Sequence, residues 1–113
     1  MIEDYAPGGM TVQGEKHRRD LKIIGGRVVP EWWREEDHRL HIGDVEDILD
    51  ASPEVLVVGT GYAGNMRVEE TLRSRLQQEG IKVVAEKTGD AVKTFNRLRS
   101  KGKNVAGAFH LTC

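Results

Sequence analysis

The sequence predicts a single α/β domain in which helices cover a mixed β-sheet. The run Val55–Val58 is apolar without alternation, which is typical of a strand buried on both faces. From there to residue 109, helical and strand patterns alternate, which predicts parallel strands joined by right-handed crossovers. A chain of 113 residues has the length of one domain, so we expect residues 1–113 to form one unit of three layers.

The N-terminal third reads as antiparallel β-structure. Residues 1–9 end in a Pro-Gly-Gly turn, residues 10–12 are a short strand candidate, and residues 15–19 form a charged surface turn. Gly25-Gly26 separates the apolar runs 21–24 and 27–29, which predicts a tight hairpin. We therefore expect an antiparallel β layer beside the main sheet.

The rest of the chain predicts a short helix and then a β-α-β-α-β unit. Asp44 is a suitable N-cap for a helix over residues 45–49, which Ser52-Pro53 ends. Val68, Leu72 and Leu76 recur at helical spacing, and Gly80 stands where a helix C-terminus favours glycine. The remaining elements are expected as a strand over 81–85, a helix that begins near Thr88 and ends at Gly102, and a strand over 105–109.

Composition excludes several classes of partner. The net charge is −1, which gives no electrostatic reason to expect nucleic acid or an anionic membrane as a partner. The single cysteine, Cys113, is compatible with a reducing compartment, and no apolar run has the length of a membrane span. The acidic N-terminus lacks a hydrophobic signal region, so we expect a cytoplasmic protein that is a monomer or a small homo-oligomer.

Residues 59–64 match the G-x-G-x-x-G pattern of dinucleotide-binding loops, with Glu86 about twenty residues further on. The helix pattern starts too late for the tight turn that a pyrophosphate needs, so we do not expect a dinucleotide. The alternatives are a loop that only turns the chain and a pocket for a small anion or polar ligand. The pocket reading implies that Gly61→Val would abolish ligand binding and leave the fold largely intact. Its candidate residues are Gly59, Thr60, Gly61, Gly64, His110 and Thr112, since the carboxyl ends of parallel strands meet at one edge.

Histidine and cysteine positions suggest no metal or catalytic site. His38 and His41 have an H-x-x-H spacing, but their segment does not look helical and nothing in the sequence completes a ligand set. His110 and Cys113 could form a nucleophilic pair, although a terminal carboxylate would raise the pKa of the thiol. We expect no catalytic residue, no cofactor and no metal ion.

The adjacent tryptophans Trp32 and Trp33 are candidates for a protein interface. Neighbouring residues of an extended segment point to opposite sides, so one can be buried while the other faces solvent. Tryptophan is enriched at binding hot spots. We take Trp32, Trp33, Arg34 and His38 as the candidate interface, with the plain alternative of one core and one rim side chain.

Several segments together resemble the Mth-type domain family, the domain-of-unknown-function family 498. Its relatives include the adipogenesis-associated Mth-domain protein and mitochondrial complex I assembly factor 3. The matching segments are Tyr5, Gly9-Met10, Val12, Gly14, Asp20-Leu21, Trp33-Arg34, His38, Asp44, residues 53–61, Gly64, residues 66–68, Gly80-Ile81, Thr88, Ala91, Phe95-Asn96, Ala108 and residues 110–113.

The resemblance implies a three-layer α/β fold on a mixed sheet and no established catalytic residues. The members of its shared pattern that are not obviously core are Trp33, Arg34, His38, Gly59, Gly61, Asn96, His110 and Cys113. Together with the aromatic pair, the resemblance favours a non-enzymatic domain that binds a partner protein or helps assembly. The alternative is a small-molecule or anion-binding protein with a pocket at Gly59–Gly64 and His110.

Overall fold

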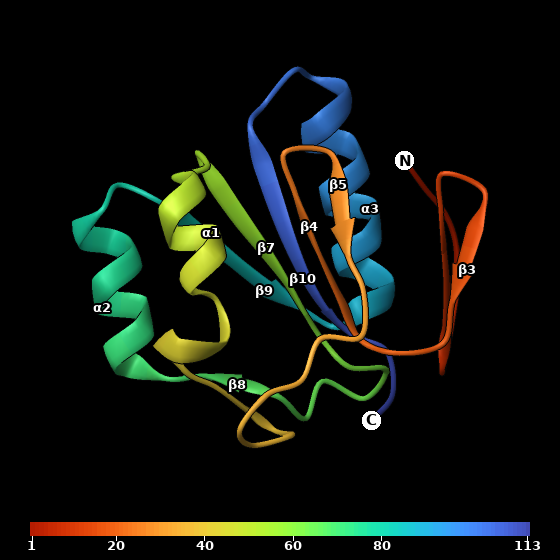
Figure 1. The fold of residues 1–113 in the computed structure, drawn as a ribbon, viewed down its shortest axis with the longest axis horizontal. Coiled ribbons are helices and arrows are strands. Elements are labelled where there is room, and N and C mark those ends of the chain that lie inside the picture. Colours follow the sequence, from red (N-terminus) through yellow and green to blue (C-terminus); the bar gives the residue numbers. More distant parts are fainter.

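The central sheet has five strands in the order β5-β4-β10-β7-β9 (Figure 1), in a computed structural model that describes residues 1–113. The strands are β1 (Ile2–Ala6), β2 (Gly9–Val12), β3 (Glu15–His17), β4 (Leu21–Ile24), β5 (Arg27–Val29), β6 (Arg39–Leu40), β7 (Val55–Thr60), β8 (Arg67–Val68), β9 (Lys82–Glu86) and β10 (Val105–His110). The helices are a 3-10 turn η1 (Ile42–Asp44), α1 (Glu46–Ala51), α2 (Glu70–Gln78) and α3 (Thr88–Ser100). No helix is long and apolar enough to cross a membrane.

The sheet is mixed, as predicted. Strands β9, β7 and β10 run parallel, and β4 pairs antiparallel with β10 and with β5. The Gly25-Gly26 hairpin is confirmed, because both glycines have positive φ, at 58° and 77°. In the C-terminal half, β7, α2, β9, α3 and β10 follow one another in the predicted β-α-β-α-β order.

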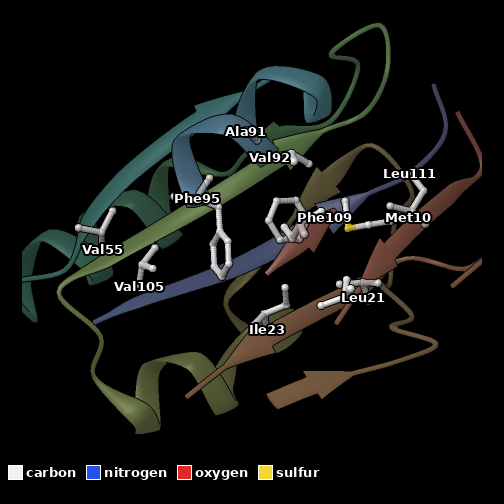
Figure 2. Packing of buried hydrophobic residues seen from close by; sticks show 13 residues of the cluster. Met10, Leu21, Ile23, Val55, Ala91, Val92, Phe95, Val105, Phe109 and Leu111 are labelled. Carbon is white, nitrogen blue, oxygen red and sulfur yellow. The ribbon is translucent and has the colours of Figure 1, made fainter. Parts of the chain in front are cut away.

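Helices cover both faces of this sheet, and each face has its own core. Along β7 and β10, alternate side chains enter opposite cores, which explains the continuous apolar run of β7. One core packs against α1 and α2. The other packs against α3 and the N-terminal strands, where Phe95 and Phe109 meet edge to face (Figure 2).

The N-terminal strands β1, β2 and β3 form a separate antiparallel sheet on the α3 side of the molecule (Figure 1). An added β layer was predicted, but the predicted hairpin over residues 21–29 belongs to the central sheet instead, and β1 and β3 of the added layer were not predicted. The sequence predicts a loop at residues 2–6 and a turn at residues 15–19. Ile2 is the only buried residue of β1, and β3 has no buried residue, so neither strand has an apolar pattern that marks it. Asn96 of α3 holds this sheet in place, since its side chain bonds both the N–H and the carbonyl of Ile2.

Two helix starts differ from the prediction. Val68 belongs to β8, which pairs with β6, so α2 begins at Glu70. Asp44 ends the turn η1, and its carboxylate accepts from the N–H of His41 instead of capping α1. Both differences come from contacts between segments that lie apart in the sequence.

Candidate functional site

A polar cavity of about 240 Å³ lies where β10 ends and β4 begins. Phe109 is paired with Leu21 in the antiparallel β10–β4 ladder, so the residues just outside it, Asp20 and His110, are neighbours. Residues 31–34 and 37–38 and the C-terminal residues complete the wall. The lining side chains are Arg18, Arg19, Asp20, Glu31, Trp32, Trp33, Arg34, Asp37, His38, His110, Thr112 and Cys113.

Asp20 connects three parts of the chain through one carboxylate. Its Oδ1 accepts a hydrogen bond from the N–H of Leu111 at 2.8 Å. Its Oδ2 lies 2.7 Å from Nη1 of Arg34 and 2.7 Å from Nδ1 of His110. The side chains of Arg34 and His110 are almost fully buried, at 3% and 6% exposure. The site is therefore a buried charge network held together by Asp20.

The protonation of this network follows from its geometry. Burial alone would raise the pKa of Asp20, but hydrogen bonds from His110, the Leu111 amide and Arg34 lower that pKa overall. An ionised carboxylate only accepts hydrogen bonds, so Nδ1 of His110 carries the proton that faces Asp20. In a neutral imidazole of this tautomer Nε2 offers a lone pair, and in the structure that atom is buried without a hydrogen-bond partner.

Arg34 and Trp32 form the wall next to His110, with Nη2 of Arg34 3.1 Å from Nδ1 of His110. The indole N–H of Trp32 donates to the carbonyl oxygen of Asp44 at 3.0 Å, and Trp32 is buried. The guanidinium of Arg34 lies 4.8 Å from the Trp32 ring and donates to the carbonyl oxygen of Asp37. Trp33, by contrast, is 76% exposed and stands beside Arg19 at 5.9 Å.

The glycine-rich loop after β7 holds the chain's own C-terminal segment. A Cβ on Gly61 would lie 2.5 Å from the carbonyl oxygen of Thr112, and Gly61 has φ of 107°. The N–H groups of Tyr62 and Asn65 donate to the carbonyls of Thr112 and Cys113. The expectation that Gly61→Val leaves the fold intact is therefore wrong, because the substitution would displace this segment.

The other predicted pocket residues lie on both sides of that segment. Thr60 is buried and donates to the carbonyl of Glu86, and a Cβ on Gly59 would collide with Phe109 and Thr88. Gly64 lies against the Lys87 side chain. Only His110 and Thr112 of the predicted set line the polar cavity.

Three potential ligand residues meet, of which the sequence had brought together only His110 and Cys113. One ligand atom from each of His38, His110 and Cys113 lies within 4.8 Å of the others. The His38 and His110 rings are 5.9 Å apart between centroids. His41 turns away and pairs with Glu36 at 2.7 Å, so the H-x-x-H spacing has no structural meaning. Apart from the proximity of His110 and Cys113 in sequence, the shared pattern of the Mth-type family, which contains all three residues, was the signal that could have joined His38 to them.

Comparisons with known proteins agree with this fold. The family model described as "Protein of unknown function (DUF498/DUF598)" matches residues 2–110. NADH dehydrogenase (ubiquinone) 1 alpha subcomplex assembly factor 3 of Xenopus tropicalis is 28% identical over 109 residues, which are 95% of this chain and 58% of that protein. This chain thus spans little more than half the length of that relative.

Solved structures match the whole domain. The structure named MT938 superposes with a TM-score of 0.83 and 27% identity, over 100% of this chain and 98% of that one. A conserved hypothetical protein from Pyrococcus horikoshii gives a TM-score of 0.85 with 24% identity, over 100% and 99% of the two chains, which shows the fold. The chain belongs to the DUF498/DUF598 family, whose members share this Mth-type fold.

Proposed function

We propose that the domain is a cytoplasmic, non-enzymatic interaction module that binds a partner protein through the surface around Trp33. The observation that carries the proposal is the 76% exposure of Trp33, a large apolar side chain that folding leaves in water. The assembly-factor name of the Xenopus tropicalis relative supports a role of this class. The cytoplasmic location rests on the single cysteine, which is compatible with a reducing compartment.

The two sequence neighbours of Trp33 are held in place by contacts within the domain. Trp32 is anchored by its indole hydrogen bond to Asp44, and its own N–H donates to the carbonyl of Asp20. Arg34 is buried in the Asp20 network. A contact residue between two fixed neighbours loses little freedom on binding, which favours affinity. In this arrangement Trp32 and Arg34 support the interface, while Trp33 and His38 form it.

Charges of both signs surround Trp33. The cavity that Trp33 lines is also lined by the cations Arg18 and Arg19 and by the carboxylates Glu31 and Asp37. Protein interfaces combine an apolar centre with a polar rim, and alternating charges in the rim select the partner. We expect the partner to offer an apolar pocket with a mixed-charge border, and we expect no nucleic acid and no membrane.

Site-specific photocrosslinking tests this proposal directly. A photoreactive amino acid at exposed Glu35 should crosslink one partner in native cells, whereas the same group at Lys101, at the end of α3, should not. Trp33→Ala should abolish the crosslink, and Tyr62→Ala, which removes the other exposed aromatic side chain, should not. A crosslink at Glu35 that survives Trp33→Ala, or equal crosslinks at both positions, would refute the Trp33 surface.

The alternative function, a small-ligand pocket at Gly59–Gly64 and His110, stays a prediction with weaker support. The buried Nε2 of His110, which has no hydrogen-bond partner, supports a ligand on that side. Against it, the carbonyl of Thr112 stands where a ligand would approach Gly61. Equilibrium dialysis against cell metabolites, with Thr112→Val as the pocket variant, would separate the two: retained binding of one metabolite that Thr112→Val weakens favours the pocket.

A further inference from the structure

We propose that His38, His110 and Cys113 form a binding site for a transition-metal ion of borderline softness, with Zn²⁺ as the reference ion. The inference concerns an ion and does not depend on the interaction surface around Trp33. Two independent observations support it. The three side chains converge in space from separate parts of the chain, and His110 buries a ring nitrogen that has no partner.

The spacing of the three ligand atoms suits one ion. Zn–N bonds are about 2.0–2.1 Å and Zn–S bonds about 2.3 Å, which in a tetrahedron separates neighbouring ligand atoms by about 3.5 Å. The atoms here lie within 4.8 Å of one another. His38 and Cys113 are exposed, so rotation of their side chains can close the remaining distance while buried His110 stays fixed.

His110 has the orientation that metal-binding histidines show. In such sites the second ring nitrogen donates to a carboxylate, which fixes the tautomer and directs the lone pair at the metal. Here Nδ1 lies 2.7 Å from Oδ2 of Asp20, and Nε2 on the other side of the ring is the unpartnered atom. A buried imidazole nitrogen without a hydrogen bond costs free energy unless something binds it. A metal ion at Nε2 removes that cost.

The electrostatic surroundings permit a cation. Three arginines line the cavity, Arg18, Arg19 and Arg34, and three carboxylates balance them, Asp20, Glu31 and Asp37. Arg34, the closest of the arginines to His110, is already paired with Asp20. The Cys113 thiolate adds one negative charge on binding, so the ion enters a cavity without excess positive charge.

The donor set selects the class of ion. Two imidazoles and a thiolate suit Zn²⁺ or copper, whereas Mg²⁺ and Ca²⁺ require oxygen ligands. Three protein ligands leave the fourth position of a tetrahedral ion open to water or to a donor from another molecule. The C-terminal segment packs against Gly61 and accepts hydrogen bonds from the loop that contains it. These contacts hold Cys113 beside the two histidines.

Titration with Co²⁺, a spectroscopic substitute for Zn²⁺, tests the site in the full chain with any affinity tag removed and the thiol kept reduced. One equivalent should produce a sulfur-to-cobalt charge-transfer band together with intense visible bands of four-coordinate cobalt. Zn²⁺ should then displace the cobalt, and the charge-transfer band and the visible bands should both disappear. Zn²⁺ should also raise the melting temperature, because an ion that binds only the folded state stabilises it.

Variants decide whether the proposed residues are the ligands. Cys113→Ser should remove the charge-transfer band, and His38→Ala should weaken Co²⁺ binding by more than about tenfold by leaving two ligands. Both positions are exposed, so both variants should fold. His41→Ala is the matched control and should bind like the parent. A parent chain without the band in roughly tenfold excess of Co²⁺, or a band that persists in Cys113→Ser, would overturn the site.

Discussion

Asp20 shows how one side chain can determine a polar site. Its carboxylate satisfies a backbone amide after β10, a buried guanidinium and a buried imidazole at the same time. Each of those groups would lose hydration on burial without gaining a partner if Asp20 were absent. The site is thus stable only as a unit.

Replacement of Asp20 by asparagine should therefore be costly. The amide keeps the shape but leaves Arg34 as a buried charge without a counter-ion, for which we expect a loss of about 3 kcal/mol in the free energy of unfolding. Urea unfolding measures the loss. Asp50→Asn, at an exposed acidic residue of α1, is the control and should change stability by less than about 0.5 kcal/mol. Equal effects of the two substitutions would mean that the buried network contributes no stability.

His41 gives a pH-dependent prediction at the same scale. The hydrogen bond that His41 donates to the carboxylate of Glu36 raises the pKa of His41 above its usual value, so the folded state holds this proton more tightly than the unfolded state. The stabilisation is complete below the ordinary histidine pKa of about 6.5 and is lost as pH rises through the folded value. Proton NMR should show a raised His41 pKa that returns to normal in Glu36→Gln. An unchanged titration in that variant would contradict the pairing.

Position at the strand ends predicted part of the site. His110 and Thr112 were placed at the strand ends by the rule for parallel sheets, and both line the cavity. Asp20 was not singled out as a site residue, because its partners Arg34 and His110 are 14 and 90 residues away along the chain. The buried charge network depends on the register between β10 and β4, and the sequence does not specify that register.

At the scale of elements, the glycine-rich loop and the C-terminal segment act as one unit. The loop resembles a phosphate-binding turn in sequence, yet its space is filled by the backbone of residues 112–113. Glycine serves here to let two backbones approach closely. A continuous apolar run predicted the strand before this loop. No pattern in the sequence predicts which atoms lie against the glycines of the loop.

Substitutions of two glycines test this arrangement. Gly61→Ala forces a side chain onto a positive φ and against Thr112, which should cost about 2–4 kcal/mol. Faster amide exchange at Tyr62 and Asn65 should accompany the loss, since their N–H groups bond the displaced segment. Gly89→Ala is the control, because a Cβ in α3 there meets nothing within 4 Å and should stabilise the helix by up to about 1 kcal/mol. Similar effects at both positions would exclude the close approach at Gly61.

The elements that the sequence missed share one property. β1 and β3 are mostly exposed, and the pair β6–β8 has only two residues in each strand. Their side chains carry no apolar alternation, so pairing with a neighbouring strand is what defines them. The strands of the buried sheet were predictable because burial on both faces leaves a continuous apolar signal.

At the scale of the whole molecule, one sheet joins two cores. β7 and β10 send alternate side chains to the α1–α2 side and to the α3 side. The α3 layer also packs against the N-terminal strands, but the central sheet is the element that both helical layers share. A substitution that destabilises one core should therefore also destabilise the other, and the domain should unfold in one cooperative step.

Phe95→Ala tests this coupling. Phe95 is fully buried on the α3 side, and its truncation should cost about 3–5 kcal/mol. Trp32 belongs to the opposite core, so in a Trp33→Phe background its fluorescence reports the other face of the sheet. The fluorescence transition in urea should shift to lower concentration together with the far-ultraviolet circular dichroism transition, with an unchanged slope. Lys93→Ala, on the exposed side of α3, should leave both midpoints in place. If the circular dichroism midpoint moved and the Trp32 midpoint did not, the two layers would be independent, and the shared sheet would not be what makes the domain cooperative.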